Sequence, residues 1–234
     1  MRVAKIAMLS ILACAGLLVV GWYGAKSRSF QVFGDLSARV ETERRVVALT
    51  FDDGPQPGAL GELLPMLRAR GVKATFFVTG AELERHPELG AALVAEGHEL
   101  GNHTYAHRRM VFKSQAFIAS EVERTDALIR ATGQTGRIHF RPPYGVKGLG
   151  LPYYLANTGR RTIMWDVEPD SDAKVASSSG AIVSHVMARA RPGSIILLHV
   201  MYPSRRTSLE AVPGIVDGLR SQGYEFVTVS ELVQ

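Results

Sequence analysis

The sequence contains a single cysteine, Cys14, in 234 residues. One cysteine excludes an internal disulfide and a thiolate zinc cluster, so any metal ion must be held by histidine and carboxylate side chains. Charged residues make up only 21% of the chain, whereas 46% is hydrophobic, with 23 glycines and 11 prolines. This composition excludes intrinsic disorder and a collagen-like fibre, and the length predicts one sizeable domain with an appendage.

The excess of positive charge is confined to the N-terminal part of the chain. The formal net charge is +5, but residues 1–45 hold seven of the 27 Lys and Arg side chains and only three of the 22 Asp and Glu side chains. Residues 46–234 are nearly neutral, with twenty basic side chains against nineteen acidic ones. A protein that binds nucleic acid carries basic charge on its folded domain, so we expect no nucleic-acid partner.

An uncharged apolar run, Ile6–Ala25, dominates the N-terminal segment. Its 20 residues would span roughly 30 Å as a helix, the thickness of a bilayer core. The run is longer than the apolar stretch of a signal peptide and has no convincing cleavage site, and Trp22 and Tyr23 suit a membrane interface. We therefore expect residues 1–29 to be an uncleaved membrane anchor, with the domain that follows outside the cytoplasm. Cleavage would instead give a secreted protein, and lipid attachment at Cys14 is a further alternative.

The rest of the chain alternates short apolar runs with longer segments of helical period. Residues 30–45 predict a linker with an edge strand near Phe30–Phe33, and residues 46–234 predict one domain. Strands are predicted at 46–51, 73–78, 98–103, 138–142, 162–167, 194–199 and 225–230, and helices near 59–70, 87–96, 114–131, 177–190 and 207–222. This alternation implies a parallel sheet, either open and doubly wound or closed into a (β/α) barrel.

Polar side chains at the ends of five predicted strands help to choose between the open sheet and the closed barrel. They are Asp52 and Asp53, His103 and His107, Arg141 and Tyr144, the segment Asp166–Asp172, and His199. Barrel enzymes carry reactive side chains at the carboxyl ends of several strands, whereas an open sheet concentrates its site at one switch point. We therefore expect an α/β fold with a distorted or incomplete (β/α) barrel.

Two short motifs have the spacing of a metal site. TFDDGP (50–55) places two carboxylates side by side, so that one can bind a metal while the other takes a proton, although Asp-Gly-Pro is also typical of a structural turn. HTYAH (103–107) spaces two imidazoles four residues apart, which suits two ligands of one ion. Together with Asp53 they give two histidines and one carboxylate, which leaves coordination positions for water and substrate, as in a catalytic site.

Two further residues are candidates for proton chemistry. Arg141 in RPPYG precedes a rigid turn, and its guanidinium could clamp a carboxylate. His199 is the polar tip of an apolar strand and could donate a proton.

The ordered motifs TFDDG, H-T-x-x-H, R-P-P-Y, a Trp-led acidic segment and L-x-H resemble those of the polysaccharide deacetylases with the NodB-homology fold, carbohydrate esterase family 4. The resemblance runs from about Val46 to the C-terminus. It implies a divalent metal, usually zinc, and removal of N-acetyl groups from N-acetylglucosamine-containing glycans such as peptidoglycan or chitin oligomers. By the same resemblance Asp52 is the general base, oriented by Arg141, and His199 is the general acid. The resemblance also implies that the metal is bound by Asp53, His103 and His107, and that the backbone N–H of Tyr144 binds the oxyanion. Leu197 would line the acetyl pocket, and Trp165 opens the fourth motif.

The fourth motif, WDVEPDSD (165–172), departs from the family pattern. Ser171 and Asp172 stand where the family commonly has an Asp followed by a Trp, so both Asp170 and Asp172 are candidates to support His199. Another amide or an O-acetyl ester is therefore an alternative substrate. A membrane-tethered glycan-binding module without catalysis is an alternative of another class.

Overall fold

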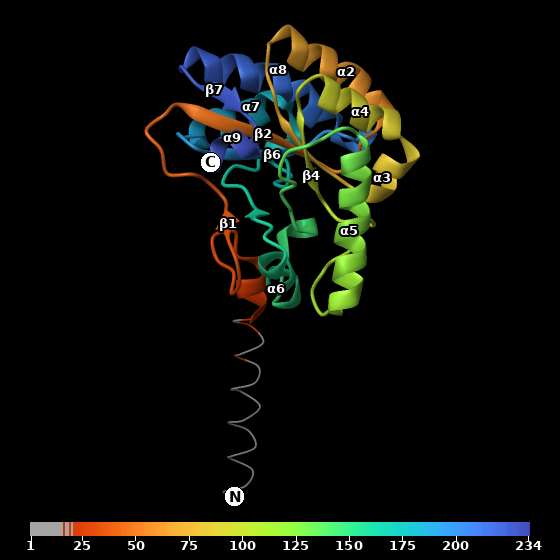
Figure 1. Ribbon diagram of the computed structural model, residues 1–234. Coiled ribbons are helices and arrows are strands. Elements are labelled where there is room, and N and C mark those ends of the chain that lie inside the picture. Colours follow the sequence, from red (N-terminus) through yellow and green to blue (C-terminus); the bar gives the residue numbers. More distant parts are fainter. Residues whose placement is uncertain (1–15, 17–18, 20) are drawn as a thin grey trace, which may run out of the picture.

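The computed structural model describes residues 16, 19 and 21–234. The strands are β1 (Leu36–Ser37), β2 (Val46–Asp52), β3 (Thr75–Val78), β4 (Glu99–Asn102), β5 (Thr162–Ile163), β6 (Ile195–His199) and β7 (Glu225–Val227). The α-helices are α2 (Pro57–Ala69), α3 (Gly80–Arg85), α4 (Pro87–Ala95), α5 (Gln115–Ala131), α6 (Gly150–Asn157), α7 (Ser179–Arg189), α8 (Arg206–Ser221) and α9 (Val229–Leu232). Residues 21–26 are also helical, and they lie at the opposite end of the molecule from α2 and α8 (Figure 1).

Strand β2 is the centre of a parallel sheet. The sheet order is β4-β3-β2-β6, and β7 pairs with the first half of β2. Every residue of β2 is buried, as expected for a parallel strand covered on both faces. In the register, Asp52 lies opposite Phe77 of β3 and His199 of β6. The carboxyl ends of neighbouring strands therefore meet at Asp52.

Single-residue bridges close this sheet into a ring. Phe140 forms parallel bridges with Asn102 at the end of β4 and with Thr162 in β5, and Val167 pairs with Ile196 of β6. The ring is thus continuous, but on one side it is held by isolated bridges rather than by full strands. The predicted distorted barrel is confirmed, and an open doubly wound sheet is excluded.

Alternation along β2 separates an outer core from the interior of the barrel. Val47, Leu49 and Phe51 pack in the large outer cluster with apolar side chains of α2 and α8. Ala48 belongs to the inner cluster, which also contains Trp165 and Leu197. Thr50 and Asp52 share the parity of Ala48. Consequently, polar groups occupy the inner face of β2 at its carboxyl end.

Several predicted elements differ from the observed ones. The edge strand lies at β1 rather than Phe30–Phe33, where the chain forms bends. The predicted strand at 225–230 stops at Val227, because Thr228 caps α9 in a capping box. The predicted strand at 138–142 is reduced to the bridging residue Phe140. Helices α3 and α6 were not predicted.

The predicted anchor falls largely outside the described residues, since positions 1–15, 17–18 and 20 of it are not described. Among the residues that are described, no helix has both the length and the apolar character needed to cross a membrane.

Candidate active site

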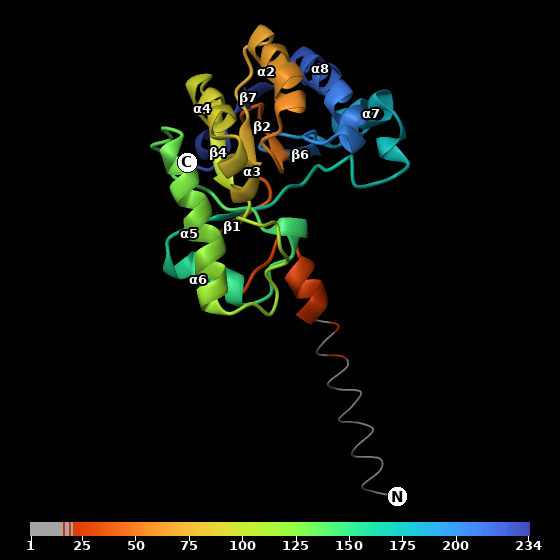
Figure 2. The same ribbon diagram turned by 90° about the vertical axis from the view of Figure 1, so that its right-hand side faces the viewer.

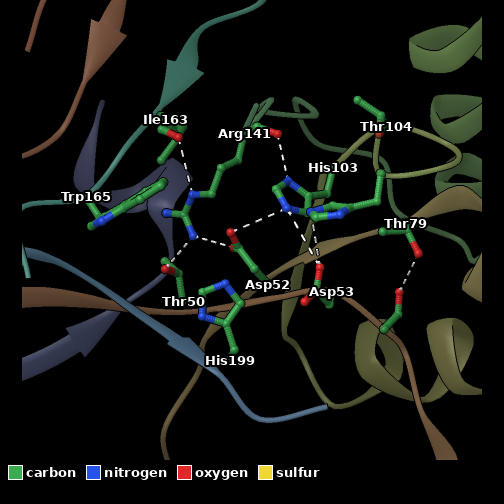
Figure 3. A network of polar contacts seen from close by, with 12 residues as sticks. Thr50, Asp52, Asp53, Thr79, His103, Thr104, Arg141, Ile163, Trp165 and His199 are labelled. Atoms are coloured by element: carbon green, nitrogen blue, oxygen red, sulfur yellow. Dashed lines mark hydrogen bonds and ion pairs between the residues drawn. The ribbon is translucent and has the colours of Figure 1, made fainter. Parts of the chain in front are cut away.

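The candidate site lies at the carboxyl ends of the barrel strands (Figure 3). Asp52 ends β2 and Asp53 follows it, His103 follows β4, and His199 ends β6. The side chains line one cavity of about 570 Å³. Residues from three separate motifs are therefore brought together in space.

Asp53, His103 and His107 form a cluster with the geometry of a metal site. The Oδ1 atom of Asp53 lies 3.5 Å from Nε2 of His107 and 4.0 Å from Nε2 of His103. One ligand atom from each residue lies within 4.8 Å of the other two. Tetrahedral zinc with bonds of about 2.0–2.1 Å separates its ligand atoms by roughly 3.3 Å. The cluster therefore fits a zinc-sized ion with only small adjustments.

The environment of His103 prepares its Nε2 atom for a cation. Its Nδ1 atom lies 2.7 Å from the carbonyl oxygen of Arg141, so Nδ1–H donates and Nε2 keeps its lone pair. Burial, and then the neighbouring imidazole of His107, lowers the pKa of His103 to about 3. The ring is therefore neutral at physiological pH, which is the form that binds metals.

Backbone strain is concentrated at this site. In the described part of the chain, five residues other than glycine adopt a left-handed φ, and Asp53, Thr104, His107 and Tyr144 are four of them, with φ values of 52–69°. This conformation is uncommon for such residues and is held by surrounding structure. The strained turns direct the ligands of both motifs to one point.

A buried ion pair fixes Asp52. The Nη1 atom of Arg141 donates to Oδ1 of Asp52 at 2.6 Å and to Oγ1 of Thr50 at 2.8 Å, and Nε donates to the carbonyl oxygen of Ile163 (Figure 3). Nη2 donates to the carbonyl oxygen of Met164. Burial lowers the pKa of Arg141, but the charge and hydrogen bond of Asp52 oppose this effect. Arginine therefore occupies one oxygen of Asp52, and the other oxygen lies 3.6 Å from Nε2 of His103.

A second ion pair holds His199. The Nδ1 atom of His199 lies 3.2 Å from Oδ1 of Asp170, and Oδ2 of Asp170 accepts from the backbone N–H of His199 and from Ser208. Burial by itself lowers the pKa of His199. The hydrogen bond and charge of Asp170 outweigh burial and, together with weaker effects of Asp52 and Asp53, raise this pKa to about 9. The ring is therefore an imidazolium at neutral pH.

Of the two acidic candidates for this role, Asp170 contacts His199 and Asp172 does not. Asp172 lies on the exposed loop, where its Oδ1 atom accepts from the backbone N–H of Lys174. Glu168, Asp170 and His199 also satisfy the distance criterion for a metal cluster. Asp170 is bonded both to Nδ1 and to the backbone N–H of His199, and this geometry makes an ion pair the better description of that group.

Tyr144, Leu197 and Trp165 also line the cavity. The ring of Tyr144 lies 4.6 Å from that of His107, and the guanidinium of Arg109 lies 4.8 Å from the centre of the Tyr144 ring. Tyr144 is half exposed, so its ring forms part of the cavity rim.

The sequence analysis missed the residues that form one wall of the cavity. Glu168 accepts from the indole N–H of Trp165 at 2.7 Å, from Ser171 at 2.6 Å, and from Arg28 at 2.5 Å. Arg28 also lies over the ring of Trp165. The acidic fourth motif was a signal for Glu168, but nothing in the sequence pointed to Arg28.

The segment that carries Arg28 is attached to the domain. The backbone N–H of Lys147 donates to the carbonyl oxygen of Ala25 at 2.9 Å, and its ammonium donates to the carbonyl oxygen of Ser27. Lys147 is buried, and burial lowers its pKa to about 8. We call residues 25–28 the strap.

Known proteins match this chain over most of its length. The family model for polysaccharide deacetylases matches residues 39–163. A peptidoglycan-N-acetylglucosamine deacetylase of Bacillus cereus is 32% identical over 201 residues, covering 86% of this chain and 94% of the relative. A chitooligosaccharide deacetylase of Bradyrhizobium is 35% identical over 212 residues, with the same two coverages of 86% and 94%.

Solved structures give the same family. A mutant with restored activity of a carbohydrate esterase family 4 pseudoenzyme, whose wild type is from Bacillus anthracis, matches with a TM-score of 0.77 at 27% identity, over 87% of this chain and 72% of the other. A peptidoglycan N-acetylglucosamine deacetylase matches with a TM-score of 0.75 at 29% identity, over 81% and 88%. The chain therefore belongs to the polysaccharide deacetylases of carbohydrate esterase family 4, and it is a hydrolase of that family.

Proposed function

We propose that this protein is a metal-dependent hydrolase that removes N-acetyl groups from N-acetylglucosamine-containing glycans, with peptidoglycan and chitin oligomers as the main candidates. One observation carries the proposal. A buried carboxylate, a cluster of three potential metal ligands and an imidazolium all line the same cavity. These are the groups that amide hydrolysis requires for a base, an electrophile and an acid.

The donor set supports a divalent ion, most simply zinc. Asp53, His103 and His107 would hold it, because two imidazoles and one carboxylate suit zinc and leave positions open. When bound, the ion supplies Lewis-acid activation of water and of the acetyl carbonyl.

The protein groups divide the proton transfers between them. Asp52 takes a proton from the attacking water while the water oxygen adds to the acetyl carbon. Arg141 keeps the Asp52 carboxylate in position. The backbone N–H of Tyr144 donates to the oxygen that becomes negative. His199 gives its proton to the nitrogen as the carbon–nitrogen bond breaks. Acetate and a free amine on the sugar are the products.

The inner wall of the cavity supports an acetyl substituent. Leu197 and Trp165 offer an apolar surface to a methyl group, whereas Glu168 and Ser171 add a polar edge beside them. This polar edge keeps an O-acetyl ester or another amide as the alternative substrate class.

The catalytic groups argue against a glycan-binding module without activity. Asp52, His199 and the three ligands are all present, and each has the partner that its role needs. We further propose that the apolar run Ile6–Ala25 anchors the enzyme in a membrane, with the catalytic domain outside the cytoplasm.

An acetate-release assay tests the proposed function. The enzyme is incubated with peptidoglycan, chitooligosaccharides and an O-acetylated polysaccharide, after chelation and again after zinc is added back. We expect acetate from N-acetylated glycans only with zinc, and little from the Asp52→Asn variant. Acetate released at full rate by chelated enzyme would contradict the metal role, and release from the ester alone would favour the alternative substrate.

A further inference from the structure

Exposed apolar side chains gather at one end of the catalytic domain. Phe112 is 98% exposed and Leu149 63%, and the other members of the group are also exposed: Phe30, Val32, Phe33 and Tyr153. Both ribbon views show their segments, 30–33, the loop before α5 and the start of α6, at the same end as helical residues 21–26 (Figures 1 and 2). We call these six side chains the apolar face.

Contacts between the segments show that they form one surface. The rings of Phe33 and Tyr153 pack edge to face at 5.4 Å. A Cβ atom added at Gly150, next to Leu149, would lie 3.6 Å from the carbonyl oxygen of Lys113, and Gln115 donates to the carbonyl oxygen of Gly150 at 2.9 Å. The loop that carries Phe112 is therefore joined to α6, which is joined to residues 30–33.

The conformation of Phe112 has no explanation within the fold. Its φ of 59° is left-handed, which is rare for a bulky residue, and its side chain is almost fully exposed. The other left-handed residues apart from glycine in the described chain lie at the active site. Strain that is retained in this way indicates a role for the side chain outside its own domain.

The charges around the apolar face have one sign. The segments 19–34, 105–120 and 145–157 contain no Asp or Glu. Lys26, Arg108 and Lys113 are exposed there, and no salt bridge of the described residues includes them. Aromatic side chains surrounded by basic ones suit the headgroup region of an anionic bilayer.

The chain itself indicates what covers the apolar face. Residues 21–26 lie at this end of the domain, and the sequence that leads into them is the apolar run Ile6–Ala25. Trp22 and Tyr23, at the end of the run, are exposed as well. An apolar run of bilayer length thus enters the domain beside an aromatic and basic surface.

We propose that the apolar face docks on the surface of an anionic lipid bilayer, with Phe112 and Leu149 inserted at headgroup depth and Lys113 and Arg108 near lipid phosphates. The inference goes beyond deacetylation and rests on the proposed membrane anchor for the choice of occupant. It predicts a fixed orientation of the catalytic domain on the membrane.

Fluorophores at matched positions test the docking in the full-length protein. Cys14→Ser removes the native thiol, and an environment-sensitive fluorophore is attached at Phe112→Cys or at the control Arg220→Cys, which lies exposed on α8 at the far end of the domain. Each protein is reconstituted into vesicles of phosphatidylethanolamine and phosphatidylglycerol. We expect the emission at position 112 to shift to shorter wavelength and to be quenched by spin-labelled lipid, and the emission at position 220 to show neither change.

The alternative occupants give different results. Equal, water-like emission from both labels in protein that floats with the vesicles would overturn docking while the anchor stands. Failure to float would overturn the anchor and docking together. A shift at position 112 caused by soluble chitooligosaccharide, or by protein concentration in detergent, would replace the bilayer with a glycan or a second copy. Acetate release from soluble glycans is measured separately, so that its absence contradicts only the proposed function.

Discussion

Replacing Asp170 by asparagine tests the role assigned to His199. The amide keeps an oxygen for the backbone N–H of His199 and for Ser208, and it has almost the same shape. It removes the negative charge that stabilises the imidazolium. Burial lowers the pKa of His199, whereas the charges of Asp52 and Asp53 still raise it, so without Asp170 this pKa is expected to fall from about 9 toward its ordinary value of 6.5.

The change in pKa sets the size of the effect. A fall of roughly 2.5 in pKa corresponds to about 3 kcal/mol in favour of the neutral ring. At pH 8 a group with a pKa near 9 is roughly 90% protonated, whereas one at 6.5 is about 3% protonated. Loss of the acid form alone should therefore slow turnover about 30-fold at pH 8. At pH 6 a ring with a pKa of 6.5 is still roughly 75% protonated, so the rate difference should be far smaller than at pH 8.

The assay is acetate release between pH 6 and pH 9, with Asp172→Asn as the matched control because Asp172 is exposed and does not contact His199.

The pH dependence of stability gives a second readout. A raised His199 pKa stabilises the fold below about pH 6.5, and this contribution is lost as the pH rises to about 9, so the wild type should lose stability across that window and Asp170→Asn should not. An Asp170→Asn variant that kept the wild-type rate at pH 8 would refute the reasoning. An equal loss of rate at pH 6 and at pH 8 would refute it as well.

Three other substitutions test the remaining groups. Asp52→Asn should lower turnover about 100- to 10,000-fold in acetate release while zinc content stays unchanged; loss of zinc would instead make Asp52 a ligand. His107→Ala should lose zinc in equilibrium dialysis and keep its circular dichroism spectrum, whereas the control His185→Ala should keep both, and zinc retained by His107→Ala would contradict the ligand set. Arg141→Lys should lower the free energy of unfolding by about 3–5 kcal/mol in denaturant titrations, because the buried Asp52 carboxylate loses its matched partner; unchanged stability would show that lysine replaces it.

The site could be predicted from the sequence because its residues occupy strand ends. Parallel strands present their carboxyl ends at one edge, so Asp52 and His199 were expected at the same edge, and the register of β2 with β6 places them opposite each other. The spacing of four residues between His103 and His107 was also sufficient to group these two histidines as ligands of one ion. The choice between Asp170 and Asp172 could not be made, because it depends on how an irregular loop turns after Trp165.

Other features depended on contacts between distant segments. Arg28 reaches Glu168 across 140 positions of the sequence, and no local pattern records such a pair. His98 and His139 illustrate the same limit, since both are buried and burial lowers the pKa of each to about 4. Replacing either buried ring would disturb the core, so His185 rather than His98 or His139 is the control for metal binding. Helix α6 begins with Gly150 and contains Pro152. Both residues have low helix propensity, so the sequence did not predict this helix.

The strap leaves almost no slack between the proposed anchor and the cavity. Its carbonyl groups are bound by Lys147, and Arg28 reaches into the cavity wall, so the domain cannot swing outward as it would on a flexible tether. In the anchored form such an enzyme would have a short working radius, meaning the distance from the membrane at which its active site can reach a glycan. It would modify glycan strands while they are still next to the membrane and would leave older, outer layers untouched. A glycine-serine spacer inserted after Ser29 would lengthen that radius only if the strap released its contacts with the domain, because the strap lies between the spacer and the proposed anchor.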